Sequence, residues 1–344
     1  MYTKNYLEYN AVNIIRHLAA IVVIYSHSYI LLYGDDHESL HSAFKYIDSA
    51  ELAVYFFFAI SGRLILQSYL NSDSLLDYIW KRFVRIFPAL LTCLILTTCT
   101  AFLFLNDVNL RNFFFNNTTL SYLSNAVFIG GYNLPFLFDG NPYPGVANGS
   151  LWTLRYEVAL YAIIPLCFLI NNKNSGRGLI IIGLIFLFFS YLSFTGKPNF
   201  SYNISKLGVI FIFASIYEYY KLKNNKYFTL VIFLSLVLAY NIDAEILYKT
   251  IFSILIVLLL NHAYFYLNRL GQIYSIRKIK FDYSYGIYIY AFFVQQLLMV
   301  FFHFTSVFFF FFSALVISFA ISWVSWYVIE KPFLNYKNLF RRTV

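Results

Sequence analysis

The sequence predicts an all-α integral membrane protein of about ten transmembrane helices, with both termini in the cytoplasm. Of its 344 residues, 60% are hydrophobic and only 12% are charged, and the mean hydropathy is +0.65. A soluble globular domain carries about 25% charged residues, so this composition excludes that class. Two further observations, the length of the apolar runs and the placement of Lys and Arg, predict the number and the direction of the helices.

Apolar runs long enough to cross a hydrocarbon core of about 30 Å recur along the whole chain. They lie near residues 11–32, 51–70, 86–106, 151–170, 178–195, 205–220, 227–242, 246–266, 283–302 and 306–329. We interpret residues 1–344 as a single integral membrane domain. Between the third and fourth runs, residues 107–150 form a long extracytoplasmic loop that ends in the turn-rich stretch Phe138–Gly149. A loop of this length is either a binding element or a disordered linker.

Lysine and arginine alternate between the segments on the two sides of the predicted helices. With both termini inside, seventeen fall in inner segments and five in outer ones, namely Lys45, Arg111, Lys197, Lys206 and Lys249. Cytoplasmic loops carry the positive excess, which supports an even number of spans. The net charge of +9 is then this inner-face bias. No nucleic-acid partner is predicted, because no soluble basic domain carries the charge.

The first apolar run lacks a small-residue cleavage site after it, so we expect it to be retained as a membrane helix. Cys93, Cys99 and Cys167 all fall within apolar runs. Their number and setting suit neither a disulfide framework nor a zinc site, and they are interpreted as small hydrophobic residues. No metal site is predicted.

Arg16 and His27 are ionisable residues within the first apolar run. Such residues are costly in a bilayer, and they usually face a protein-lined cavity and have a function. A separation of eleven residues places the two side chains within about 20° of one another and roughly 16 Å apart along a helix. One helix face therefore carries a cation and a titratable imidazole. A hydrogen-bonded packing role is the alternative for His27.

The second apolar run contains FFFAISGRLILQSYL, residues 56–70, in which Ser61 and Gly62 interrupt aromatic and aliphatic residues. A pair of small residues favours close packing of two helices. Arg63 follows directly, and a buried arginine needs a carboxylate or carbonyl partner or a wet cavity. Whether that partner belongs to the protein or to a substrate stays open.

The sequence KRFVRIFP, residues 81–88, stands at the cytoplasmic entrance of the third run. Arg82 and Arg85 are three residues apart and would share one face of a helix. Guanidinium groups at a membrane entrance suit the binding of phosphates. The alternative is that these charges only set the orientation of the helix.

Glu157 lies in NGSLWTLRYEVALY, residues 148–161, about 9 Å below the outer start of the fourth run. His27 lies about 7–8 Å below the outer end of the first run, so the two side chains are predicted at the same depth. A carboxylate beside an imidazole fixes its tautomer and stabilises the imidazolium, as general-base catalysis requires. The alternative is a structural ion pair of Glu157 with Arg155 or Arg63.

Six segments, in this order, resemble the acyltransferase-3 family of integral membrane acyltransferases, many of which O-acetylate bacterial surface polysaccharides. The segments are RHLAAIVVIYSHSY, FFFAISGRLILQSY, KRFVRIFPAL, SLWTLRYE, DYSYGIYIYAFFVQQ at 282–296 and WYVIEKPF at 326–333. Three positions depart from the usual pattern: Asn13 replaces a common Asp, Arg63 a common aromatic, and Phe293 a common Pro. None of these departures removes the Arg16–His27 or the Arg82–Arg85 pair.

The resemblance implies a multi-pass enzyme of the bacterial cytoplasmic (inner) membrane that transfers an acyl group, most often acetyl from acetyl-CoA, to a sugar hydroxyl. The acceptor would be a surface polysaccharide such as O-antigen (lipopolysaccharide) or capsule, or a lipid-linked glycan. Acetyl-CoA is then a substrate, and no permanently bound cofactor is implied. The expected site residues are His27, Glu157 and Arg16 for catalysis, Arg82, Arg85 and Lys81 for the donor, and Arg63, Trp152, Tyr285, Tyr288 and Gln295 for the acceptor. Glu330 is expected to form a structural salt bridge.

Alternatives remain at this stage. A transporter or flippase of a lipid-linked saccharide would also use about ten helices with buried charges, although the chain shows none of the internal symmetry common in transporters. A longer acyl donor or another acceptor would keep the enzyme class. His27 acts either as a general base or as the residue that accepts the acyl group. The sequence does not assign an oligomeric state.

Overall fold

A computed structural model describes residues 2–34, 46–103, 105, 109–169, 173, 175–193, 199–223, 225–241, 245–273, 279 and 281–341. Over these residues the chain is helical, and its extended pairing is limited to an isolated bridge between Asn133 and Val146. This confirms the all-α prediction. The chain divides into two compact units, and α1 (Tyr2–Tyr33) contributes residues to both.

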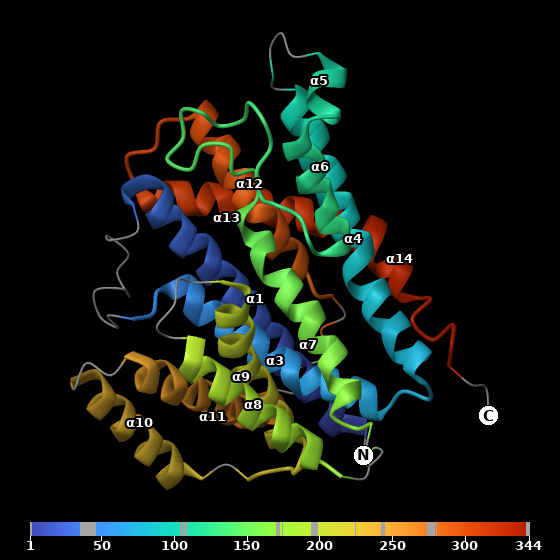
Figure 1. Cartoon of the computed structure of the whole chain (residues 1–344), viewed down its shortest axis with the longest axis vertical. Helices are drawn as coiled ribbons and strands as arrows, with labels where there is room; N and C mark the ends of the chain where they lie inside the picture. Colours follow the sequence, from blue (N-terminus) through green and yellow to red (C-terminus); the bar gives the residue numbers. More distant parts are fainter. Residues whose placement is uncertain are drawn as a thin grey trace. The chain divides into compact units, whose positions relative to one another are not determined.

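The first unit comprises Met1–Ala19, Glu51–Leu75 and Tyr156–Lys280. Besides the start of α1, its helices are α3 (Ser49–Leu70), α7 (Leu154–Leu166), α8 (Arg177–Ser193), α9 (Phe200–Tyr219), α10 (Lys226–Asn241) and α11 (Glu245–Ile273). Helix α8 packs along α9, and α10 packs along α11 (Figure 1).

The second unit comprises Ala20–Ala50, Leu76–Arg155 and Phe281–Val344. Its elements are the rest of α1, α4 (Leu75–Leu103), α5 (Leu110–Phe114), α6 (Asn117–Leu123), the 3₁₀ turns η2 (Ser124–Val127) and η3 (Gly149–Thr153), α12 (Ser284–Phe301), α13 (Val307–Ser325), the π-helical turn η5 (Trp326–Glu330) and α14 (Lys331–Leu334). Helix α12 packs on both α13 and η3.

Each of the ten predicted spans falls on a helix, and within the described residues seven helical segments are long and apolar enough to cross a membrane. The runs at 151–170, 178–195 and 227–242 correspond to α7, α8 and α10, which have 13, 17 and 16 residues. A perpendicular span needs about 20 residues. Ten spans and cytoplasmic termini therefore stay predictions.

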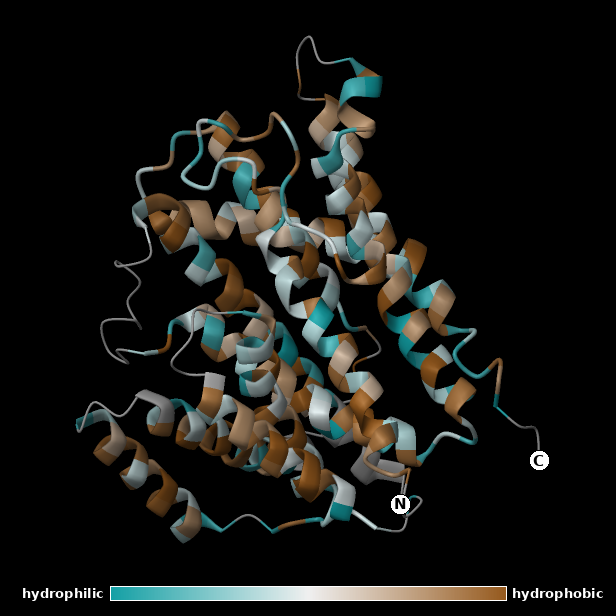
Figure 2. Ribbon diagram, in the orientation of Figure 1, coloured by the Kyte–Doolittle hydropathy of each residue, from teal (hydrophilic) through white to brown (hydrophobic). Residues whose placement is uncertain are grey.

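Large apolar side chains cover much of the exposed surface. Figure 2 shows α10 as hydrophobic over most of its length. On α13, Phe308 and Phe309 are 68% and 69% exposed. A soluble protein rarely leaves such surface in water, whereas lipid tails accept it. The exposure pattern agrees with the membrane assignment.

Helix α4 begins eleven residues before the predicted run at 86–106, at Leu75, so the prediction of its start was wrong. The segment KRFVRIFP is part of the helix, and Pro88 lies in its interior. Proline is tolerated in membrane helices where other groups satisfy the freed backbone. The hydroxyl of Thr92 donates to the carbonyl of Pro88 at 2.9 Å. The predicted end of this run, at residue 106, lies outside the described residues.

The outer segment is structured over residues 109–150, while residues 107 and 108 of the predicted loop lie outside the described part of the chain. The side chains of Asn109 and Asn116 cap α5 and α6 by accepting from backbone N–H groups. Further along, backbone hydrogen bonds join Leu134 N to Gly145 O and Ala147 N to Tyr132 O. The described part of this segment is therefore ordered by its own hydrogen bonds, and a binding role for it stays a prediction.

Gly62 allows α3 and α9 to approach at backbone distance. A Cβ at this position would lie 2.1 Å from the carbonyl oxygen of Phe211, and the hydroxyl of Ser215 donates to the carbonyl of Gly62 at 2.9 Å. The packing interpretation of the Ser61-Gly62 pair is thus confirmed for Gly62.

We predict that Gly62→Ala destabilises the protein by about 1–3 kcal/mol or more, because backbone atoms of α9 would have to move. Thermal unfolding of purified protein in detergent measures this as a lower midpoint. Gly183→Ala is the control, since its Cβ would meet only side-chain atoms at 3.4 and 3.6 Å. Equal midpoints for the two variants would contradict the close approach of α3 and α9.

Candidate functional site

The sequence-predicted site residues divide between the two units. Arg16, Arg63 and Glu157 belong to the first unit. The second unit holds the remaining ones, which are His27, Lys81, Arg82, Arg85, Trp152, Tyr285, Tyr288 and Gln295. The two groups are described separately.

His27 lies on α1 with its ring against Phe292 of α12. The ring centroids are 5.2 Å apart and the planes meet at 87°, an edge-to-face contact. Among the described residues, no hydrogen-bond partner reaches the buried Nδ1 atom of His27. The imidazole therefore packs edge-to-face against an aromatic ring, and a role of its nitrogens in proton transfer stays a prediction.

Gln295 anchors the turn of α1 that carries His27. Its side chain is fully buried, and its amide Nε2 donates to the carbonyl of Ile24 at 2.9 Å and to the hydroxyl oxygen of Ser28 at 2.8 Å. Ser28 itself donates to Ile24 O at 2.8 Å. Phe292 and Gln295 are three residues apart and hence neighbours on one face of α12. Together they fix both the ring of His27 and the backbone around it.

The NGSLW segment packs against the same face of α12. Asn148 is fully buried, and its amide donates to Ile289 O at 2.7 Å while its oxygen accepts from Ser150 N. A Cβ on Gly149 would lie 3.1 Å from Cε2 of Phe292. Glycine at 149 thus leaves room for the ring that contacts His27.

The predicted acceptor residues Trp152 and Tyr288 belong to the same contact. Trp152 lies in η3, and the next residue, Thr153, shares a hydrogen bond of 2.8 Å with the hydroxyl of Tyr288. Tyr288 is largely buried. The hydroxyl of Tyr288 is therefore held by η3, and its contact with an acceptor stays a prediction.

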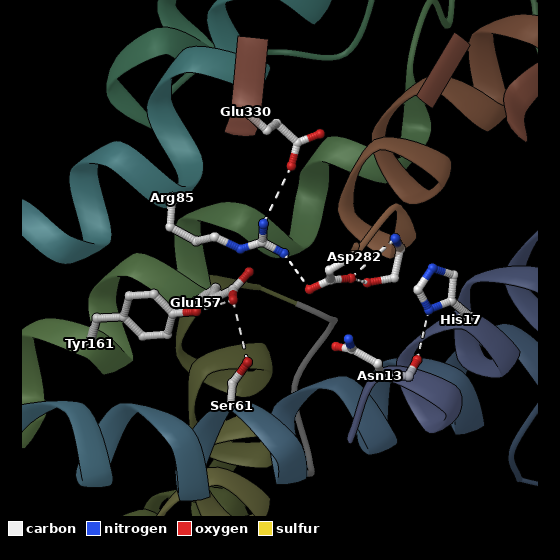
Figure 3. A network of polar contacts seen from close by, with 9 residues as sticks. Asn13, His17, Ser61, Arg85, Glu157, Tyr161, Asp282 and Glu330 are labelled. Carbon is white, nitrogen blue, oxygen red and sulfur yellow. Dashed lines mark hydrogen bonds and ion pairs between the residues drawn. The ribbon is translucent and has the colours of Figure 1, made fainter. Parts of the chain in front are cut away.

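Arg85 is the centre of an ion-pair cluster at the start of α12. Its guanidinium donates to Asp282 at 2.6 Å and to Glu330 at 3.4 Å (Figure 3). Both carboxylates are buried, and Asp282 also accepts from the backbone and hydroxyl of Ser284. The salt bridge expected for Glu330 is confirmed. Two carboxylates more than balance the charge of Arg85.

Two aromatic rings complete the surroundings of Arg85. The rings of Tyr285 and Trp326 each have their centroid 5.9 Å from the guanidinium carbon. The hydroxyl of Tyr285 donates to the carbonyl of Ile86 at 3.2 Å. Tyr285 therefore has a structural contact within this unit, and its role toward an acceptor stays a prediction.

The other predicted donor residues lie on the same helix, α4. Lys81 forms an i,i+4 ion pair with Asp77 at 2.6 Å. Arg82 and Arg85 both lie on α4, three residues apart, so the helical spacing predicted for them is confirmed. Their binding of donor phosphates stays a prediction.

In the first unit, Glu157 is held by hydroxyl groups. Tyr161, one turn later on α7, and Ser61 on α3 both donate to its Oε1 atom, Ser61 at 3.4 Å (Figure 3). Among the described residues, Arg63 pairs with Glu218, and Arg155 donates to Gly130 O and to the Tyr132 hydroxyl. An ion pair of Glu157 with either arginine stays an alternative. The predicted pairing of Glu157 with His27 stays a prediction.

Arg63 finds its partner within the protein. Its Nε atom lies 2.9 Å from a carboxylate oxygen of Glu218 on α9, and its guanidinium lies over the ring of Tyr264 on α11, 4.6 Å from the centroid. The amide of Gln67 also donates to Glu218 at 2.9 Å. This network resolves the open question about Arg63 in favour of a protein carboxylate. A role of Arg63 toward the acceptor stays a prediction.

The first half of α1 carries Arg16 and His17. Arg16 is half-buried, and its catalytic role stays a prediction. His17 donates from Nδ1 to the carbonyl of Asn13 at 2.7 Å (Figure 3). His17 and His27 therefore differ, because one ring nitrogen of His17 is bound within its own helix.

Sequence reasoning did not single out several residues of these contacts, among them Ser28, Asp282 and Phe292. Each lies inside or beside a segment that carried the family resemblance. A sequence signal existed for Asp282, because it is an acidic residue directly before the apolar run at 283–302. Phe292 gave no such signal among the 40 phenylalanines.

Comparison of the sequence with known proteins identifies the family of this chain. The model of the acyltransferase-3 family, described as an acyltransferase domain, matches residues 9–327. The chain belongs to this family. It is an O-acyltransferase with several apolar helices suited to a membrane, and this class replaces the transporter alternative.

Two curated relatives of this acyltransferase are described. An O-acetyl transferase of Shigella phage Sf6 is 30% identical over 337 residues, which cover 95% of this chain and 96% of the relative. Nodulation protein 10 of Rhizobium leguminosarum bv. viciae is 26% identical over 178 residues, which cover 51% of this chain and 48% of the relative. No solved structure matches the acyltransferase.

We predict that Gln295→Leu lowers the acyltransferase rate by up to about 100-fold, because the turn carrying His27 loses its two hydrogen bonds to α12. Rates at saturating donor and acceptor measure this. Gln295→Glu keeps the size of the side chain but not the two donors and should be similarly slow. Ser28→Ala removes one of the two contacts, and its acyltransferase rate should lie between the rates of these variants and that of wild type. Wild-type rates for Gln295→Leu would refute the anchoring role.

We predict that Arg85→Ala destabilises the acyltransferase by about 3–5 kcal/mol, since it leaves two buried carboxylates without their cation. The thermal midpoint in detergent measures the loss. The triple variant Arg85→Met/Asp282→Asn/Glu330→Gln should recover most of the midpoint, because it removes all three charges. If Arg85→Ala unfolds at the wild-type temperature, the cluster does not stabilise the fold.

Proposed function

We propose that this acyltransferase is an O-acetyltransferase of the bacterial inner membrane, which moves an acyl group, most often acetyl, from acyl-CoA at the cytoplasmic face to a sugar hydroxyl. The acceptor is a surface polysaccharide such as O-antigen or capsule, or its lipid-linked precursor. Support comes from the likeness to an O-acetyl transferase over 95% of the chain. The observation that carries the proposal is the His27 imidazole, held by Phe292 and by the Gln295 anchor.

His27 supplies the acid–base chemistry of the transfer. As a general base it takes the proton of the sugar hydroxyl, the oxygen forms a bond to the thioester carbonyl carbon, and the C–S bond breaks to release CoA. His27 then returns the proton to the CoA thiolate. In the alternative route the imidazole nitrogen accepts the acyl group first and passes it to the sugar. Both routes need a ring nitrogen that no protein group occupies.

Lys81, Arg82 and Arg85 on α4 are proposed to bind the phosphates of the donor at the cytoplasmic face. Bidentate guanidinium contacts suit phosphate oxygens. For Arg85 and Lys81 a donor phosphate competes with carboxylates of the protein, Asp282 and Glu330 in one case and Asp77 in the other. The uncharged pantetheine arm then carries the thioester toward the membrane interior, with Arg16 further along its path.

Glu157 is proposed to orient His27 and stabilise the imidazolium. Within the first unit its Oε1 atom accepts from the hydroxyl groups of Ser61 and Tyr161. For the acceptor we retain Arg63, Trp152, Tyr285 and Tyr288 as lining groups. Gln295 is reassigned from acceptor binding to positioning, because its amide N–H groups are used by α1.

We predict that His27→Ala lowers transfer of label from radiolabelled acetyl-CoA to the host's surface polysaccharide by about 10²–10⁴-fold, the usual contribution of a general base. Membranes with matched amounts of each variant are compared. His17→Ala is the control on the same helix and should keep near wild-type transfer, because His17 is bonded to Asn13 O.

Two results would change the proposal. Transfer by His27→Ala at the wild-type rate would exclude both catalytic routes through this residue. If wild type transfers no label from acetyl-CoA but does so from a longer acyl-CoA, the enzyme class stands and the acetyl donor does not. Acid-quenched single turnovers distinguish the routes, since label bound to wild-type protein and absent from His27→Ala indicates an acyl-histidine.

A further inference from the structure

The predicted outer segment of the second unit contains three phenylalanines in left-handed backbone conformation. Phe128, with φ of 65°, directly follows η2 and ends it. Phe136 and Phe138 both have φ of 59°. This region disfavours residues with a Cβ, and non-glycine residues found there are often held at functional sites. Pro135 and Phe136 form a turn, and the second position of such a turn ordinarily carries Gly or Asn when φ is positive.

Phe136 and Phe138 differ in what offsets this strain. Phe138 is 6% exposed, and its ring lies 6.0 Å from that of Phe293 on α12. Burial of the ring against α12 accounts for Phe138. Phe136 is 55% exposed, so packing within the protein does not account for a phenylalanine there.

The turn that carries Phe136 has a rigid base. Leu134 N donates to Gly145 O at 2.9 Å, and Gly145 N donates to Leu137 O at 2.8 Å. The side chains of Leu134 and Leu137 on either side are buried. The backbone that carries the exposed ring is therefore fixed, which lowers the entropic cost to a ligand that binds there.

The same segment is tied to the helix that holds His27. The Gln296 amide donates to Tyr143 O and Val146 O, both at 2.9 Å, and Asn141 donates to the Gln296 side-chain oxygen at 2.8 Å. Gln296 directly follows Gln295, the anchor of the His27 turn. The position of Phe136 is thus linked through α12 to the position of the imidazole.

The geometry points to Phe136 as an acceptor-binding residue, whose ring packs against the apolar C–H face of a sugar unit of the glycan. This inference rests on the proposed function for the class of ligand. Asn133 and Asp139 are exposed near it in the sequence and offer hydrogen-bond partners for hydroxyl groups. A polar neighbourhood that includes a carboxylate favours a glycan over lipid as the occupant. Binding energy from a sugar remote from the reacting hydroxyl would favour long acceptors.

Binding is tested in the full-length His27→Ala protein in lipid nanodiscs, so that activity is not needed. Phe136→Trp is introduced and its fluorescence is followed as de-O-acetylated host polysaccharide is added. Phe115→Trp is the matched control, because Phe115 is 73% exposed in the same outer segment but has φ of −95°. We expect a saturable change of tryptophan fluorescence at position 136 and no change at position 115. No change at 136, or quenching at 136 by brominated lipid without glycan, would overturn the inference.

Kinetics in the active enzyme provide the second test. Phe136→Gly removes the ring without backbone strain, and it should raise the acceptor KM about tenfold. The donor KM should not move, and the thermal midpoint should not fall, because glycine relieves the strain of a positive φ. An unchanged acceptor KM in an enzyme that transfers label overturns the inference alone. If wild type transfers no label but the tryptophan at 136 still reports binding, the proposed function fails and the glycan site stands.

Discussion

Buried amide side chains that must find partners inside the protein determine the arrangement of the second unit. No water is available in a hydrocarbon core, so an unsatisfied amide there is costly. Gln295 and Gln296 are both fully buried on α12. The first bonds to α1 at Ile24 and Ser28, and the second bonds to the outer segment. Helix α12 therefore sets the register of two elements that are far apart in the sequence.

Asn148 contributes to the same arrangement from the opposite direction. Its amide reaches Ile289 O on α12, and Thr153 shares a hydrogen bond with Tyr288. The Gly149 backbone then lies against Phe292, which in turn contacts His27. A proposed catalytic imidazole is thus placed by packing and amide bonds of its neighbours. This is how a side chain with a free ring nitrogen can be held in a fixed orientation.

Ion pairs are a second constraint, since several half-buried cations among the described residues have a carboxylate close to them. Arg85 lies between Asp282 and Glu330, Arg63 pairs with Glu218, and Lys206 pairs with Glu51 at 2.7 Å. The π-helical turn Trp326–Glu330 brings its last residue to Arg85. Balanced pairs of this kind fix helices, and a phosphate ligand must then displace or share a carboxylate. The sequence motif around residues 81–85 therefore combines a structural role with a proposed binding role.

The sequence alone determined the all-α membrane class, the presence of a helix on each apolar run and the family, while it missed the start of α4 by eleven residues. Apolar runs and ordered motifs are local signals, and a bilayer enforces them along the chain. It also predicted the salt bridge of Glu330 and the close packing at Gly62. Tertiary structure decided which groups meet. In the structure Arg63 pairs with Glu218, and Glu157 accepts hydrogen bonds from two hydroxyl groups. Helix α4 begins at Leu75, and the Gln295 side chain donates a hydrogen bond to α1. Such pairings depend on distances between helices, which the spacing of residues along one helix does not contain.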